Sequence, residues 1–449
     1  MELKKYKLGE ILDVTRGASL SGKFYAAEGE YVRLTCGNFD YQNNCFKENK
    51  AKDNLYYIGD FKPDFLMKEG DIITPLTEQA IGLLGSTAII PESGKYIQSQ
   101  DVAKIVCKEH LLDKDFAFYL ISSNLVKQQL SAAAQQTKIR HTSPDKIKDC
   151  IVWIPELEEQ KRIGKLLRTI DLKIELNRQL NQNLEAMTKQ LYDYWFVQFD
   201  FPNEEGKPYK SSGGAMVWNE TLKRDIPEGW NDCVLGDYIG RITNGLNPRK
   251  NFVLGNGNNY YVTIRSLAGT TIDWNNCDRC DDEALAKINS RSQLQIGDII
   301  FSAIGTIGRT YYILEEPSNW NISETSFTLR AKNNVPNDFF YGMLRSNEIQ
   351  IKSDKAAMGS TLRCLVMDSL CSLLYVKVPE KIMCTFSAKV SPLYRQIHQN
   401  NKEIAELTKQ RNELLPLLMN GQVSVNSDLA VSYIIYKNKI IRIMKENII

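Results

Sequence analysis

The sequence predicts an α+β protein in which two pseudo-repeated domains are joined by two long helices that form an antiparallel coiled coil. Three observations lead to this class: short motifs recur at a nearly constant interval, a heptad pattern follows each copy, and a segment rich in Gly, Pro, Ser and charge separates the copies. We expect a first domain at 1–155, a long helix at 156–199, a linker at 200–229, a second domain at 230–379, a second long helix at 380–421 and a C-terminal tail at 422–449.

The repeat is carried by short motifs that keep their order. Leu8-Gly9-Glu10 recurs as Leu235-Gly236-Asp237, and the Gly-Asp-Ile-Ile run at 70–73 recurs at 297–300, both at an interval of 227 residues. Further on, Gly82 and Gly85 match Gly305 and Gly308 at an interval of 223, as if the second copy lacked four residues of a loop. Ile154-Pro155-Glu156 then matches Val378-Pro379-Glu380. Several matches in one order favour a duplicated domain.

Inside the first copy, short β-rich runs alternate with amphipathic stretches. Residues 72–73, 87–90 and 102–106 are rich in Ile, Val and Ala and predict strands, whereas 116–130 predicts a helix. This mixture is typical of an α+β domain.

After each Pro-Glu pair the apolar residues follow a spacing of four and three, which is the a/d seam of a heptad. Each helix should run for roughly 35 residues, or about 50 Å at 1.5 Å per residue. The first seam is Ile163, Leu167, Ile170, Ile174, Asn177, Asn181, Leu184, Thr188, Leu191 and Trp195. The second is Phe386, Val390, Leu393, Ile397, Asn400, Ile404, Leu407, Arg411, Leu414 and Leu418.

Two matched seams of equal length are natural partners for each other, so an antiparallel pair about a pseudo-two-fold axis is favoured over two helices that pack separately on their own domains. Asn177 and Asn400 occupy equivalent seam positions near the middle of the helices. A polar residue at a seam position typically fixes the register of a coiled coil. We therefore expect the axis to bring these two asparagines together.

Composition limits the class of protein. Hydrophobic residues make up 43% and charged residues 24% of 449 residues, as in globular proteins. The net charge of +2 gives no support by itself for a nucleic-acid partner. No apolar run is long enough to span a membrane, and the N-terminus lacks a signal-peptide pattern, so we expect a cytoplasmic protein whose ten cysteines are free thiols.

Several segments of the sequence resemble catalytic motifs, but none of these motifs is complete. Residues 17–23 have phosphate-loop spacing, but Phe24 stands where a hydroxyl must hold magnesium. Pro144-Asp145 with Glu159-Gln160-Lys161 imitates a nuclease centre, but its second part begins the long helix, so the groups would not converge. Cys277 and Cys280 form one isolated CxxC, so we expect no zinc or other metal site. Because no catalytic motif is complete, we also expect no catalytic site in this chain. The Asn/Asp-Pro-Pro-aromatic loop of adenine methyltransferases is absent.

Taken together, these motifs resemble the specificity subunits of type I restriction-modification systems over roughly residues 1–425. The resemblance rests on the Leu-Gly-Glu/Asp domain openings, the Gly-Asp-Ile-Ile runs, Ile154-Pro155 with Glu159-Gln160, the linker 201–214, the restart at 226–230 and the run at 414–421. It implies that each domain is a target recognition domain for one half of a split site in double-stranded DNA.

The resemblance also implies a set of partners. The paired helices would act as a spacer and dock two methyltransferase subunits, and restriction (translocase) subunits would join for cleavage. S-adenosylmethionine, magnesium and ATP are expected on those partners, with no cofactor in this chain. Two other interpretations stay open: a stand-alone methyltransferase or restriction enzyme whose motifs have drifted, and a coiled-coil scaffold without a DNA role.

The residues that touch bases are chosen by chemistry alone. Arg pairs with guanine, Asn or Gln with adenine, and Lys, Ser or Thr with phosphates. The alternative for each is an ordinary solvated surface residue. Candidates in equivalent polar loops are Arg33 and Asn38 with Arg265 and Ser266, and Lys138, Arg140 and His141 with Ser360, Thr361 and Arg363.

Overall fold

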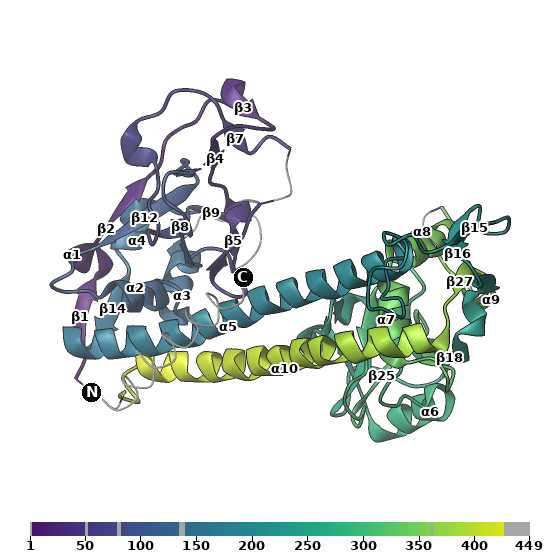
Figure 1. The fold of residues 1–449 in the computed structure, drawn as a ribbon. Helices are drawn as coiled ribbons and strands as arrows, with labels where there is room; N and C mark the ends of the chain where they lie inside the picture. The colour runs from purple at the N-terminus through teal and green to yellow at the C-terminus, as the bar shows by residue number, and fades with distance from the viewer. Residues whose placement is uncertain (1, 50–52, 79–81, 134–139, 361, 426–449) are drawn as a thin grey trace. The chain divides into compact units, whose positions relative to one another are not determined.

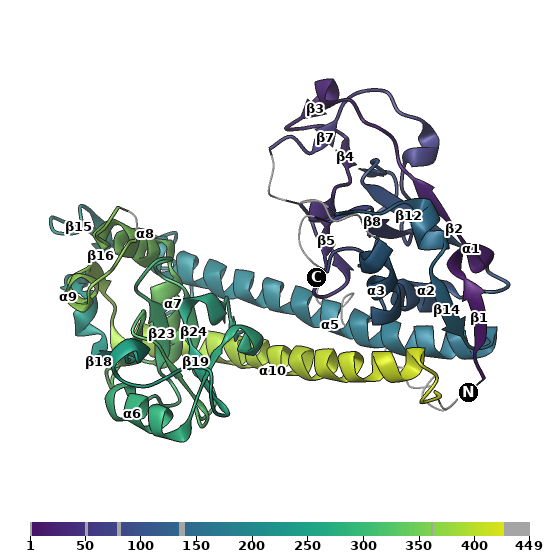
Figure 2. The same cartoon turned by 180° about the vertical axis from the view of Figure 1, so that it is seen from behind.

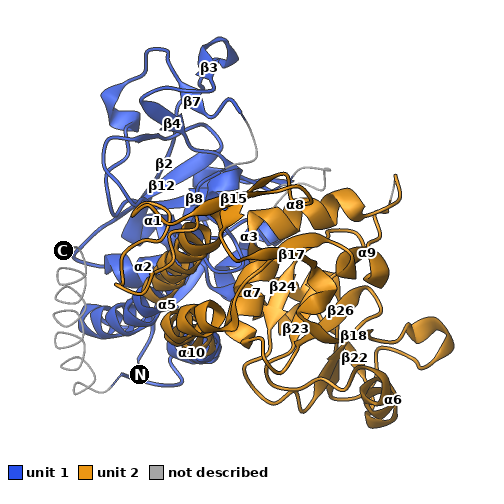
Figure 3. Cartoon of the chain, turned by 45° about the vertical axis from the view of Figure 1, so that its right-hand side comes forward, with its two compact units in different colours: residues 1–174, 405–449 blue, residues 175–404 orange. Residues whose placement is uncertain are grey.

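The computed structural model describes residues 2–49, 53–78, 82–133, 140–360 and 362–425 (Figure 1). These residues form two compact units (Figure 3). Unit 1 contains residues 1–174 and 405–449, and unit 2 contains 175–404. Each long helix contributes one part to unit 1 and another to unit 2.

Unit 1 is built on antiparallel sheets. Its first and last strands, β1 (Lys4–Lys7) and β14 (Ile151–Ile154), pair with each other and bring the two ends of the domain together. A four-stranded sheet has the order β10-β8-β12-β2, and a second has the order β11-β4-β7-β3 with β11 and β4 parallel. Their bounds are β2 Leu12–Arg16, β3 Tyr25–Ala26, β4 Tyr31–Arg33, β7 Tyr56–Tyr57, β8 Ile72–Pro75, β10 Ala88–Ile89, β11 Tyr96–Ile97 and β12 Val102–Cys107.

Unit 2 repeats this plan. Strands β17 (Asn231–Val234) and β27 (Leu374–Lys377) pair as β1 and β14 do. The order β24-β23-β26-β18 corresponds to β10-β8-β12-β2, and the parallel pair β19 and β25 corresponds to β4 and β11. The bounds are β18 Ile239–Asn244, β19 Asn259–Val262, β22 Asp278–Cys280, β23 Ile299–Ser302, β24 Thr310–Tyr312, β25 Trp320–Ile322 and β26 Ser326–Ala331. The predicted pseudo-repeat and α+β class are confirmed.

Short helices cover the sheets. In unit 1 the helix expected at 116–130 is two helices, because the chain breaks at Ser122, whose hydroxyl donates to the carbonyl oxygens of Phe118 and Tyr119. A side chain bonded to its own backbone in this way competes with the helical ladder. The helices are α1 Leu8–Ile11, α2 Lys114–Ile121, α3 Asn124–Ala133 and α4 Pro144–Lys148; in unit 2 they are α6 Asp282–Ser292, α7 Asn337–Arg345, α8 Asn347–Ala356 and α9 Met367–Cys371.

The long helices are α5 (Leu157–Tyr192, 36 residues) and α10 (Glu380–Met419, 40 residues). In unit 1, Ile163 and Leu167 of α5 share a core with Leu418 of α10. In unit 2, Tyr192, where α5 ends, shares a core with Phe386, near the start of α10. The two helices therefore run antiparallel, as the seams predicted (Figure 2).

Most seam positions are buried, including polar ones: Asn177, Asn181, Thr188, Asn400 and Arg411 are each at most 7% exposed. The expected Asn177–Asn400 pair does not form. Asn177 Nδ2 donates to Glu403 at 2.7 Å, and Asn400 Nδ2 donates to Asn181 at 2.8 Å. The axis relating the two helices therefore falls between 177 and 181 on α5, which places each asparagine opposite a different residue.

The segment expected as a linker at 200–229 is folded onto unit 2. Asp200 accepts hydrogen bonds from the Ser211 amide at 2.7 Å and from its hydroxyl at 2.6 Å. Phe201 stacks on Tyr209 and Trp230 at 4.8 and 5.0 Å between ring centroids. These buried aromatic contacts were not visible in a composition rich in Gly, Ser and charge. The hairpin of β15 (Met216–Asn219) and β16 (Arg224–Pro227) completes the segment, and residues 426–449 of the expected tail lie outside the described residues.

Candidate nucleic-acid interface

The candidate loops occupy equivalent places in the two units. After α3, the chain of unit 1 returns as β13 (Arg140–His141) and pairs with β9 (Thr77–Glu78), His141 opposite Thr77. In unit 2 the equivalent bridge joins Cys364 to Ile304. The first copy is four residues longer than the second at this point, and its extra residues come directly after Thr77 in the sequence.

A second pair of equivalent loops lies after β4 and β19. In unit 1 the 3-10 turn η2 (Cys36–Asn38) leads into a hairpin of β5 (Phe39–Asp40) and β6 (Cys45–Phe46). In unit 2 the turn η7 (Ile264–Ser266) leads into a hairpin of β20 (Leu267–Ala268) and β21 (Thr271–Ile272). These hairpins are called the recognition hairpins below.

Three of the predicted DNA contacts are buried. Arg33 is 8% exposed, lies 4.0 Å from the centroid of the Tyr25 ring and donates to the Asn54 carbonyl at 3.3 Å. Asn38 is 1% exposed, and its side-chain oxygen accepts from the Thr35 amide at 2.9 Å. Ser266 is fully buried and donates to Asn276 at 3.0 Å. These side chains are engaged within their own domains, which the sequence did not indicate, and their contact with DNA stays a prediction.

Arg265 is the exposed member of that group. Its side chain is 78% exposed and its guanidinium lies 4.0 Å from the Asp278 carboxylate. The turn that presents it is held by Arg309, which donates to the carbonyls of Ile264 and Leu267 at 3.0 and 3.1 Å. Sequence reasoning missed Arg309, although it directly follows Gly308 of the repeated glycine motif.

In the second group of candidates, some side chains are exposed and others have hydrogen-bond partners within the chain. His141 and Ser360 are exposed, whereas Lys138 and Thr361 lie outside the described residues. Arg140 donates to the Ser131 hydroxyl at 3.0 Å. Arg363 donates to the carboxylate and the carbonyl of Asp354 and to the Ala357 carbonyl. Both arginines therefore have intramolecular partners that a DNA contact would have to replace.

Glu78 is a second residue that sequence reasoning missed. Its carboxylate is 5% exposed on the side chain and accepts from the amides of Gly82, Leu83 and Leu84 at 2.7, 3.0 and 3.4 Å. Arg140 lies 3.7 Å from its other oxygen. Glu78 is the first of the four residues that the second copy lacks. The difference in length between the two copies could therefore have indicated a loop that only the first domain has.

In the described part of the chain, no group of three or more His, Cys, Asp and Glu side chains could hold a metal ion. Burial raises the pKa of both the Cys277 and the Cys280 thiol. Of the helices in the described ranges, none combines the length and the apolar character that crossing a bilayer requires.

The comparisons with known proteins agree with this arrangement. Residues 1–186 match the model of the type I restriction modification DNA specificity domain. The chain is 25% identical to the type I restriction enzyme MjaIX specificity subunit of Methanocaldococcus jannaschii over 73% of each chain. It is 23% identical to the HindI specificity subunit of Haemophilus influenzae over 94% of this chain and 99% of that one. The chain is therefore similar to type I specificity subunits over most of its length, and residues 1–186 match their DNA specificity domain.

A solved specificity subunit from M. genitalium has the same fold, with a TM-score of 0.59 at 17% identity over 93% of this chain and 96% of that one. The family model covers the first domain and most of α5. The second domain lies outside that match, but it repeats the strand order of the first.

Proposed function

We propose that this chain is the sequence-specific DNA-binding specificity subunit of a type I restriction-modification complex. It reads a bipartite site in double-stranded DNA, and it docks two methyltransferase subunits and the restriction subunits. S-adenosylmethionine, magnesium and ATP bind to those partners and not to this chain. The similarity to type I specificity subunits supports a non-catalytic, specificity-giving role.

One observation carries the bipartite site: a single domain fold occurs twice with different loop chemistry. Both copies keep the same sheet order and the same bridge, but the first carries His141 and the Glu78 loop where the second carries Cys364 and no insertion. Sequence is read by side chains that reach base edges, whereas a scaffold only positions them. Two copies of one scaffold with different loops are therefore suited to two different half-sites.

The isolated chain is expected to bind DNA weakly, because a net charge of +2 neutralises few phosphates, whereas a complex with two methyltransferase subunits is expected to bind tightly. Fluorescence anisotropy with a duplex that carries the methylated site, measured across salt concentrations, checks this. Comparable sequence-specific affinity of chain and complex would contradict it. Adenine methylation by the chain alone would favour a stand-alone enzyme, and a complex that does not retain DNA would favour a scaffold.

A further inference from the structure

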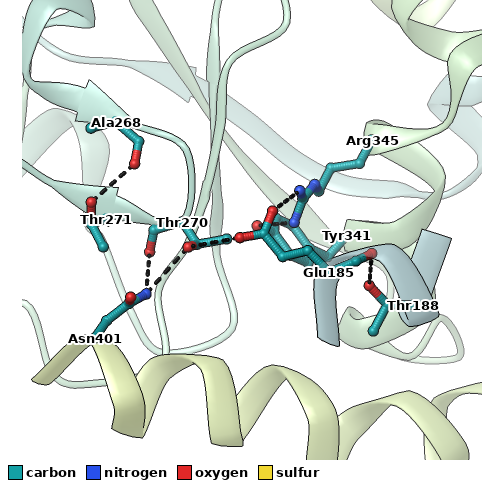
Figure 4. A network of polar contacts seen from close by, with 8 residues as sticks. All are labelled: Glu185, Thr188, Ala268, Thr270, Thr271, Tyr341, Arg345 and Asn401. Carbon is teal, nitrogen blue, oxygen red and sulfur yellow. Dashed lines mark hydrogen bonds and ion pairs between the residues drawn. The ribbon is translucent and has the colours of Figure 1, made fainter. Parts of the chain in front are cut away.

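The tips of both recognition hairpins are bonded to the long helices, although the residues that form the bonds are unrelated. In unit 2 the tip residue is Thr270, between β20 and β21. Its hydroxyl donates to Glu185 of α5 at 3.3 Å. Asn401 of α10 donates to both the Thr270 hydroxyl and the Thr270 carbonyl, at 3.2 and 3.3 Å (Figure 4).

The unit 2 contact is extended on both sides. Glu185 accepts from Arg345, where α7 ends, at 2.7 Å, so the same carboxylate joins α5 to the domain at a second point. Asn401 accepts from Asn181 at 2.7 Å, and Asn181 accepts from Asn400. Hydrogen bonds therefore connect the hairpin tip to the polar residues that fix the register of the two helices.

Unit 1 reaches the same arrangement with other side chains. Asn43 lies at the tip between β5 and β6, and its carbonyl accepts from Arg411 of α10 at 3.4 Å. Arg411 forms an ion pair with Asp171 of α5 at 2.7 Å, and Asp171 accepts from Tyr119 of α2 at 2.6 Å. Helices α2 and α7 follow equivalent strands, so an acid on α5 joins the equivalent domain helix in each unit.

We propose that these contacts act as latches that fix the orientation of each recognition domain on the helix pair, and that in unit 2 Glu185 and Asn401 are positioning residues acting through Thr270. The inference rests on the proposed function. The Thr270 hairpin follows directly after the turn that presents exposed Arg265. A hairpin held from both helices limits where Arg265 meets the duplex, and it thereby limits which spacing between half-sites is accepted.

The test uses the double variant Thr270→Val with Asn401→Ala, which removes every hydrogen bond between the hairpin tip and the helices. Thr271→Val is the matched control, because the Thr271 hydroxyl donates to Ala268 within the hairpin at 2.9 Å. In the full chain, hydrogen exchange at the amides of residues 267–272 is expected to accelerate roughly tenfold in the double variant, since the loss of two or three ordinary hydrogen bonds is enough for this change. Unchanged exchange would overturn the latch.

The second measurement is the methylation of duplexes by the complex of this chain with its methyltransferase subunits. The preference for the wild-type gap over gaps one base pair longer or shorter is expected to fall roughly tenfold in the double variant, with both half-site sequences unchanged. Faster exchange with unchanged gap preference would overturn the positioning role. If the wild-type complex methylates no bipartite site, the proposed function fails, and the exchange measurement still decides whether the latch exists.

Discussion

Replacing Arg411 by alanine is expected to destabilise unit 1 by about 3 kcal/mol, because it leaves the partly buried Asp171 carboxylate without its cation. The Arg411 and Asp171 side chains are 9% and 15% exposed and lie 2.7 Å apart. The Tyr119 hydroxyl remains as a neutral donor, since burial, and then the Asp171 charge, raise its pKa well above the ordinary value. One neutral hydrogen bond does not replace an ion pair.

Native-state hydrogen exchange at core amides such as that of Leu167 measures the change in unit 1. Lys161→Ala is the matched control on α5, because Lys161 pairs with Glu158 at 51% and 70% exposure, and such surface pairs contribute little to stability. An Arg411→Ala loss no larger than that of the control would show that the buried pair does not stabilise unit 1.

Replacing Phe386 by alanine is expected to destabilise unit 2 by about 3–5 kcal/mol through loss of a buried ring and the cavity it leaves. Phe386 is fully buried. Its ring packs edge-on against those of Tyr192, Trp195 and Phe196 at 5.8, 5.7 and 5.0 Å between centroids, which joins both long helices to the domain core. The loss therefore affects the helix pair and the sheet together.

Urea unfolding followed by tryptophan fluorescence, to which buried Trp195 contributes, reports on the change at the Phe386 site. Cys384→Ala, two residues away on the exposed face of α10, is the matched control and should change stability by less than about 0.5 kcal/mol. A Phe386→Ala variant that unfolds at the urea concentration of the control would contradict the assigned packing.

The sequence was sufficient for the duplicated fold and for the paired helices, because heptad spacing and repeated motifs are local patterns. It was not sufficient for the partner of Asn177. A repeat shows that 177 and 400 are equivalent, whereas the position of an antiparallel axis depends on packing along both helices. Glu403 and Asn181 therefore appear only in the structure.

The exposure of the candidate residues could not be predicted from the sequence. Residue type alone could not separate exposed Arg265 from Arg33, whose guanidinium is buried against Tyr25. The contacts between the hairpin tips and the long helices could not be predicted from the sequence either. Thr270 and Asn43 have different chemistry and lie at tips of different length. Because the two copies use unrelated residues at these equivalent positions, the sequence contains no repeated motif that would indicate the contacts.

The most direct test of the central claim, that each domain reads one half of a split site, is a methylation map after domain exchange. Residues 1–155 are replaced by those of a relative with a different site, and the boundary falls between β14 and α5. Methylated adenines are then mapped in a host that carries the intact system. We expect one half of the motif to change while the other half and the gap stay as in the wild type. A folded, active complex in which both halves change, or neither does, would contradict the account.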